Sequence, residues 1–158
     1  MGYIELIRKD IGTKPLIACG ANVIIVDQNN RILLHHRRDN DKWGLPGGFM
    51  EIGESLEDNA KREVFEETNL TCMELKLFNI YSGKEFYYKY PDGNEVYNVT
   101  ATYICKKYYG EIVVEVTEGK EVKFFDIENI PLNISPPVVK IIDDYIEHYK
   151  NSKNLKSV

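Results

Sequence analysis

Cysteine is scarce in this chain of 158 residues, which has three, Cys19, Cys72 and Cys105. They are far apart and odd in number, so they do not form the framework of a small disulfide-rich secreted domain. They also lack the short spacing of a zinc site. They indicate buried thiols in a reducing compartment, and we therefore expect a cytoplasmic protein.

Long apolar runs and a basic excess are also missing. No hydrophobic stretch approaches the roughly 18 residues that a transmembrane helix needs. The first residues carry Glu5 and Asp10, which does not match the layout of a signal peptide. The net charge is −5, whereas a protein that coats nucleic acid normally carries a basic excess. We expect neither a membrane nor a nucleic-acid partner, although a small phosphorylated ligand stays compatible with this charge if a metal offsets it.

Internal repeats and low-complexity linkers are absent too. A chain of this length, 43% hydrophobic, is the usual size of one domain with a real core. We place that single domain at residues 1–150. Residues 151–158, NSKNLKSV, are polar and without periodicity, and we expect them to form a flexible C-terminal tail.

What is present predicts an ordered series of elements. Apolar residues at helical spacing predict a helix near residues 3–11. The β-branched run at 16–27 predicts a buried strand, paired as a hairpin with a strand at 31–37. After a glycine-rich loop, Ser55 is a candidate N-cap and Asn69 a candidate end of a helix. Further strands are expected at 73–81, 84–90, 95–108, 111–116 and 121–127, and an amphipathic helix at 136–150. This order predicts an α+β fold with a mixed β-sheet flanked by helices.

The predicted helix before Asn69 concentrates negative charge. Glu63, Glu66 and Glu67 occupy an arc of about 100° on one helix face, and such like charges repel one another. The positions four residues after them hold no basic residue. Oxygen ligands at this density suit Mg²⁺ or Mn²⁺ rather than zinc. A charge run of this kind is otherwise typical of a solvated helix face.

The spacing of this cluster closely resembles the Nudix box. The matching positions are Gly48, Glu54, Arg62, Glu63, Val64, Glu66, Glu67 and Leu70. The family pattern has glycine where this chain has Asn69, and Asn is the next-best residue for that helix stop. The lead-in WGLPGG at 43–48 is similar as well. The box covers 23 residues, and the expected strand order fits the Nudix fold, a mixed sheet sandwiched between helices, over most of the chain.

The resemblance implies a MutT-like hydrolase that uses Mg²⁺ or Mn²⁺ to cleave the pyrophosphate linkage of a nucleoside diphosphate joined to another moiety. By similarity, Glu63, Glu66 and Glu67 would hold the metal, with the Gly48 carbonyl as a further ligand. A metal bound there would neutralise phosphate oxygens and lower the pKa of a bound water.

Two more residues of the box have an implied role. Glu54 and Arg62 would pair as a brace that fixes how the carboxylates point. The general base varies within the family, and it comes from the box or from a later loop. Glu118 and Glu121 are the loop candidates here, and the competing interpretation is that they are solvent-facing charges.

Other residues carry weaker signals. Tyrosines and phenylalanines around residues 81–97 could stack on a nucleobase, but aromatics in strands are more often core and cross-strand pairs. Arg38 and Lys42, before the box, could meet phosphates, although surface charge is the simpler interpretation. His35 and His36 are interpreted as structural.

The substrate stays open at this stage: ADP-ribose, a dinucleoside polyphosphate and an oxidised nucleoside triphosphate all fit. The alternative function is a non-catalytic Nudix-type sensor that binds a nucleotide. Such proteins usually lose box carboxylates, and this chain keeps them. Because related enzymes often dimerise, a homodimer is compatible with the resemblance, but the sequence has no interface signal.

Overall fold

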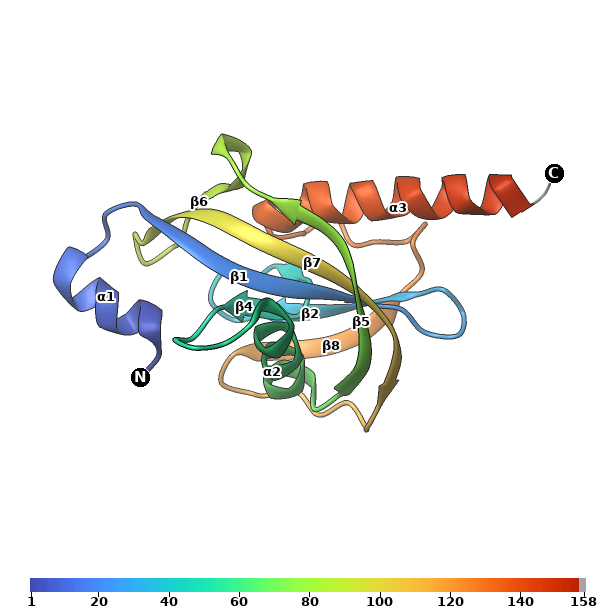
Figure 1. The fold of residues 1–158 in the computed structure, drawn as a ribbon, viewed down its shortest axis with the longest axis horizontal. Helices are drawn as coiled ribbons and strands as arrows, with labels where there is room; N and C mark the ends of the chain where they lie inside the picture. Colours follow the sequence, from blue (N-terminus) through green and yellow to red (C-terminus); the bar gives the residue numbers. More distant parts are fainter. Residues whose placement is uncertain (157–158) are drawn as a thin grey trace.

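The structure, a computed structural model, describes residues 1–156 (Figure 1). Its elements follow in the order α1 (Tyr3–Ile11), β1 (Leu16–Ile25), β2 (Ile32–Arg37), β3 (Trp43–Gly44), β4 (Gly47–Phe49), α2 (Leu56–Thr68), β5 (Thr71–Tyr81), the 3₁₀ turn η1 (Lys84–Phe86), β6 (Tyr87–Lys89), β7 (Glu95–Tyr109), β8 (Gly119–Phe125) and α3 (Pro136–Lys156). The predicted N-terminal, central and closing helices are confirmed.

The strands form two sheets. The larger is mixed, with the order β4-β1-β7-β5 and with β6 paired to β7; β1 and β7 run parallel and the other pairs antiparallel. The smaller sheet is antiparallel, with the order β3-β2-β8. The predicted hairpin of β1 with β2 is wrong, because β4 and β7 occupy the two edges of β1. The end of β1 and the start of β2 are joined only by an isolated bridge between Val26 and Ile32.

From Gly20 onward, strand β1 is buried on both faces, and its side chains there are apolar except for Asn22. Val23 and Ile25 contribute to the core cluster that contains Ala60 and Val64 of α2. Ile24 contributes to a second cluster, which contains residues of α3. Successive strand residues point to opposite faces, so α2 and α3 cover opposite faces of the mixed sheet. This arrangement confirms the predicted α+β fold, with a mixed sheet sandwiched between helices.

Helix α2 begins and ends as the sequence predicts. Asp58 N–H donates to Ser55 Oγ at 3.1 Å, which caps the first turn. Asn69 adopts the left-handed conformation with φ 63°, and its N–H donates to the Phe65 carbonyl at 2.8 Å. The helix is therefore fixed at both ends by local contacts.

Two segments differ from expectation. Residues 111–116 form a loop rather than a strand, tied to the end of α2 by Val113 N–H on the Thr68 carbonyl and by Asn69 Nδ2 on the Glu111 carbonyl. The predicted loose tail is helical through Lys156, because extending an existing helix costs far less than starting one. Residues 157–158 lie outside the described part of the chain. None of the helices within residues 1–156 has the length and apolar character needed to cross a bilayer.

Candidate active site

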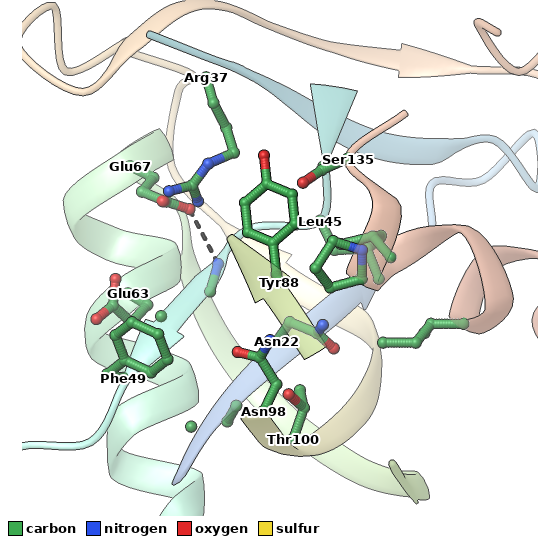
Figure 2. Close-up of a pocket in the computed structure, with 18 of the residues that line it drawn as sticks. Asn22, Arg37, Leu45, Phe49, Glu63, Glu67, Tyr88, Asn98, Thr100 and Ser135 are labelled. Atoms are coloured by element: carbon green, nitrogen blue, oxygen red, sulfur yellow. Dashed lines mark hydrogen bonds between the residues drawn. The ribbon is translucent and has the colours of Figure 1, made fainter. Parts of the chain in front are cut away.

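A pocket of about 250 Å³ opens between α2, the two sheets and the start of α3 (Figure 2). Glu63 and Glu67 stand on one side of it, on α2, while Asn22, Asn98 and Thr100 stand on the other, on β1 and β7. We call the side with Glu63 and Glu67 the carboxylate end of the pocket and the other side the amide end. The other residues that line the pocket are Gly20, Ala21, Arg37, Asn40, Gly44, Leu45, Gly47, Gly48, Phe49, Tyr88, Tyr90, Glu118, Ser135, Pro137, Val138 and Ile141.

The helix gives its three clustered carboxylates different environments. The side chains of Glu63 and Glu67 are 13% and 4% exposed and line the pocket, whereas that of Glu66 is 53% exposed. Gly48 lies against Glu63: a Cβ at position 48 would come within 2.6 Å of the Glu63 carboxyl carbon. Glycine at position 48 therefore lets the Glu63 carboxylate approach the β4 backbone, and a larger residue would push this carboxylate aside.

Glu67 is fixed from two sides. Its Oε2 accepts the Gly47 backbone N–H at 2.9 Å, the bond drawn in Figure 2. Its Oε1 lies 3.3 Å from Nδ1 of His35, a histidine on β2 that is itself buried. The histidine that the sequence indicated as merely structural thus touches the carboxylate end.

Arg62 holds the loop against the helix as the resemblance implied. Its Nε donates to Glu54 Oε1 at 2.5 Å, and its Nη2 donates to the Phe49 carbonyl at 3.0 Å. Hydrogen bonding by Arg62 lowers the pKa of Glu54, and the Glu54 carboxylate in turn raises the pKa of Arg62. Arg62 Nη1 also donates to Glu63 at 2.8 Å and to Glu66 at 3.0 Å. A basic partner does therefore relieve this cluster; it precedes Glu66 by one turn rather than following it.

Even with Arg62 beside it, Glu63 is short of positive charge. Burial and the nearby Glu67 carboxylate raise the pKa of Glu63 to about 7. Burial disfavours the charged form, and a second negative charge adds to that effect. A divalent cation bound near these carboxylates would favour their charged forms and would lower the pKa of Glu63.

The donor atoms at this end fit a hard divalent ion. Glu63 and Glu67 offer carboxylate oxygens, Glu66 lies at the rim, and Mg²⁺ and Mn²⁺ prefer such ligands. Within residues 1–156 no three acidic, histidine or cysteine side chains already converge as a finished metal site. Arg62 holds Glu63 and Glu66 in this structure, so these two side chains would have to turn toward an ion.

The wall that faces α2 comes from β2 and from the loop before β8. Arg37 lines the pocket and donates through Nη2 to Asp39 at 2.7 Å. Burial lowers the pKa of Arg37, but the Asp39 and Glu67 carboxylates raise it more, so its guanidinium is charged. Glu118 lines the pocket too, and burial together with the Glu67 charge raises the pKa of its carboxyl.

The two loop carboxylates proposed as bases are thus separated by the structure. Glu118 lines the pocket. Glu121 lies on β8, paired with His36 of β2; its side chain is half-exposed, and its carboxylate is 3.3 Å from Lys123 Nζ. Glu121 is not among the residues that line the pocket. The geometry therefore does not support the catalytic role expected for Glu121.

The amide end carries neutral hydrogen-bonding groups held by their neighbours. Thr102 Oγ1 donates to Asn22 Oδ1 at 2.7 Å, and Asn98 Nδ2 donates to the Phe86 carbonyl at 2.9 Å. These bonds orient the Asn22 amide from β7 and the Asn98 amide from the turn η1. Fixed amides of this kind can pair with a neutral polar ligand group.

Only some of the aromatic and basic residues that the sequence offered as substrate contacts lie at the pocket. Tyr88 and Tyr90 line the pocket, Tyr81 and Phe86 are core residues, and Tyr87 packs on Tyr97 away from the pocket. The two basic candidates serve nearby loops. Arg38 Nε donates to the Gly119 carbonyl at 3.1 Å, and Lys42 Nζ donates to Asn133 at 3.1 Å.

Sequence reasoning missed Arg37, Asn22, Asn98 and the contact of His35. The alternation of β2 could have indicated two of them, because Leu33 faces α2 and residues 35 and 37 point to the same side of the strand. A lone asparagine in an apolar run, as at Asn22, is the corresponding signal in β1.

Known proteins resemble this chain along most of its length. The family model described as NUDIX domain matches residues 18–145. An ADP-ribose pyrophosphatase of Methanocaldococcus jannaschii is 35% identical over 130 residues, which cover 80% of this chain and 72% of that protein.

Solved structures share the fold. A MutT NUDIX hydrolase from Burkholderia pseudomallei superposes with a TM-score of 0.69 at 23% identity, over 82% of this chain and 97% of that one. The NUDIX domain of Shewanella oneidensis NrtR, crystallised with ADP ribose, superposes with a TM-score of 0.68 at 20% identity, over 94% and 99%. Because the family model extends over most of its length, this chain belongs to the Nudix hydrolase family.

Proposed function

We propose that this chain is a Mg²⁺- or Mn²⁺-dependent pyrophosphohydrolase that acts on a nucleoside diphosphate linked to another moiety. The observation that carries the proposal is the pairing of two little-exposed carboxylates, Glu63 and Glu67, at one end of a pocket whose other end offers fixed neutral amides. An anionic diphosphate needs a cation at the first end, and an uncharged nucleoside group needs hydrogen bonds at the second.

Glu63, Glu66 and Glu67 would hold the divalent ion, with the Gly48 carbonyl as a further ligand. When bound, such an ion neutralises phosphate oxygens and acidifies a water molecule. Arg62 keeps the helix and the β4 loop in register by bonding Glu54 and the Phe49 carbonyl.

Arg37 and Glu118 would act from the opposite wall. The charged Arg37 guanidinium is suited to bind a phosphate oxygen. Glu118 is our candidate general base, because it lines the pocket and its raised pKa makes its carboxylate a better proton acceptor.

A groove beside the pocket supports a substrate with a group at each end of its diphosphate. Arg37, Phe49 and Tyr90 line both the pocket and this groove, which continues between α1 and the β6–β7 hairpin past Ile4 and Val96. A nucleoside at the amide end would leave the second moiety in this groove. ADP-ribose has this form, and the pyrophosphatase relative and the NrtR complex are named for it.

The test is hydrolysis of ADP-ribose, a dinucleoside polyphosphate and an oxidised nucleoside triphosphate, each with Mg²⁺ or Mn²⁺ and with Glu67→Gln as the control for contaminating activity. We expect metal-dependent release of a nucleoside monophosphate, fastest from a substrate with groups at both ends. Tight binding of ADP-ribose without turnover of any substrate would instead support the nucleotide-sensor alternative.

A further inference from the structure

His35 is a buried polar side chain that its strand and core packing do not explain. It is 1% exposed, and neither ring nitrogen makes an aligned hydrogen bond to protein in the described part of the chain. Leaving a buried polar group unpaired costs about 1–3 kcal/mol. An apolar residue would fill this position on β2 without that cost.

The chain also makes room for this imidazole. Gly119, at the start of β8, faces it so closely that any Cβ there would overlap with Nε2 of His35. The ring is therefore confined between β8 and α2. In this position, Nδ1 points to the helix and lies 3.3 Å from Oε1 of Glu67.

The Glu67 carboxylate can accept a hydrogen bond from this nitrogen. Its Oε2 already accepts the Gly47 N–H at 2.9 Å, and a second bond to Oε1 would fix how the carboxylate is turned. An imidazole can donate its Nδ1–H to Oε1. Arg62 bonds the other two carboxylates of the cluster, Glu63 and Glu66.

We propose that His35 is a positioning residue: through its Nδ1–H it holds Oε1 of Glu67, and with the Gly47 N–H on Oε2 it fixes the plane in which this carboxylate binds a divalent ion. The inference rests on the metal site of the proposed function. Partners that orient a metal ligand in this way are typically worth about 10–100-fold in metal affinity.

The experiment measures Mn²⁺ affinity by calorimetry on the nucleotide-free protein, so that turnover plays no part. His35→Leu removes the donor, and His35→Asn keeps an N–H close to the Nδ1 position. His36→Leu is the matched control, because His36 is the neighbouring residue of β2 but stacks on Trp43, away from Glu67. Thermal unfolding checks that each variant is folded, and His35→Met replaces the Leu variant if that one does not fold.

We expect His35→Leu to weaken Mn²⁺ binding by about 10–100-fold, with His35→Asn and His36→Leu close to wild type. In the Glu67→Gln background, His35→Leu should cause no further loss, because the group through which it acts is gone. Wild-type affinity in His35→Leu, or two losses that multiply, would refute the role of His35. If the wild-type protein itself binds no Mn²⁺, the metal-dependent function is wrong and the inference falls with it.

Discussion

The two walls of the pocket are built in different ways. The α2 wall is local: the cap at Ser55, the brace at Arg62 and the carboxylates follow one another between Gly48 and Leu70. The opposite wall joins Arg37 on β2 to Glu118 on a loop far along the chain. The carboxylates proposed to bind the ion therefore lie in one segment, whereas the groups that would act on substrate come together only through sheet pairing.

The largest expected effect comes from the α2 wall. Glu67→Gln should lower kcat/KM by about 1,000-fold, because a metal ion contributes several kcal/mol of charge stabilisation in the transition state. Steady-state kinetics at saturating Mg²⁺ measures this loss. Near wild-type turnover in this variant would show that Glu67 is not a metal ligand and that the α2 wall does not carry the ion site.

The same wall should make stability depend on pH in the metal-free protein. The pKa of Glu63 rises from 4.5 to about 7 on folding, which corresponds to about 3 kcal/mol. The folded state binds this proton more tightly than the unfolded state, so the contribution is present below pH 4.5 and is lost as the pH rises through 7.

Urea unfolding with a chelator present, between pH 4.5 and 8, measures this dependence. Glu63→Gln should flatten the curve, since glutamine does not titrate. Added Mg²⁺ should restore stability at high pH. An unchanged slope in Glu63→Gln would assign the titration to another group.

The opposite wall should matter next. Glu118→Gln should lower kcat by about 100-fold if Glu118 is the general base, while KM changes little. Glu121→Gln is the matched control, because this carboxylate lies on the same segment but away from the pocket. Equal losses in both variants would place the base elsewhere and show that the loop contributes only through its fold.

The smallest effect tests how local the α2 wall is. Ser55→Ala removes the bond from Asp58 N–H and should cost about 1 kcal/mol in the free energy of unfolding. Because Ser55 does not line the pocket, kcat/KM should stay near wild type at low temperature. A large loss of activity without unfolding would mean that the helix start also sets the geometry of the carboxylates.

Much of the fold could be read from the sequence, but pairings between distant strands could not. Ser55 and Asn69 marked the ends of α2, because capping uses bonds between neighbours. The predicted hairpin of β1 with β2 is wrong, because β1 pairs with β4 and β7 instead, and these pairings join segments that are distant in the sequence. The segment 111–116 looked like a strand, yet its apolar residues Val113 and Val116 are exposed in a loop.

The sequence by itself determined the family, the helix with its carboxylates and the Arg62 brace, because these depend on spacings within a few helical turns. Only the tertiary structure decided that Glu118 rather than Glu121 faces those carboxylates, and that His35 touches Glu67. Such contacts join residues that lie far apart along the chain, and their distances follow from how the strands pair and how the helix packs on them.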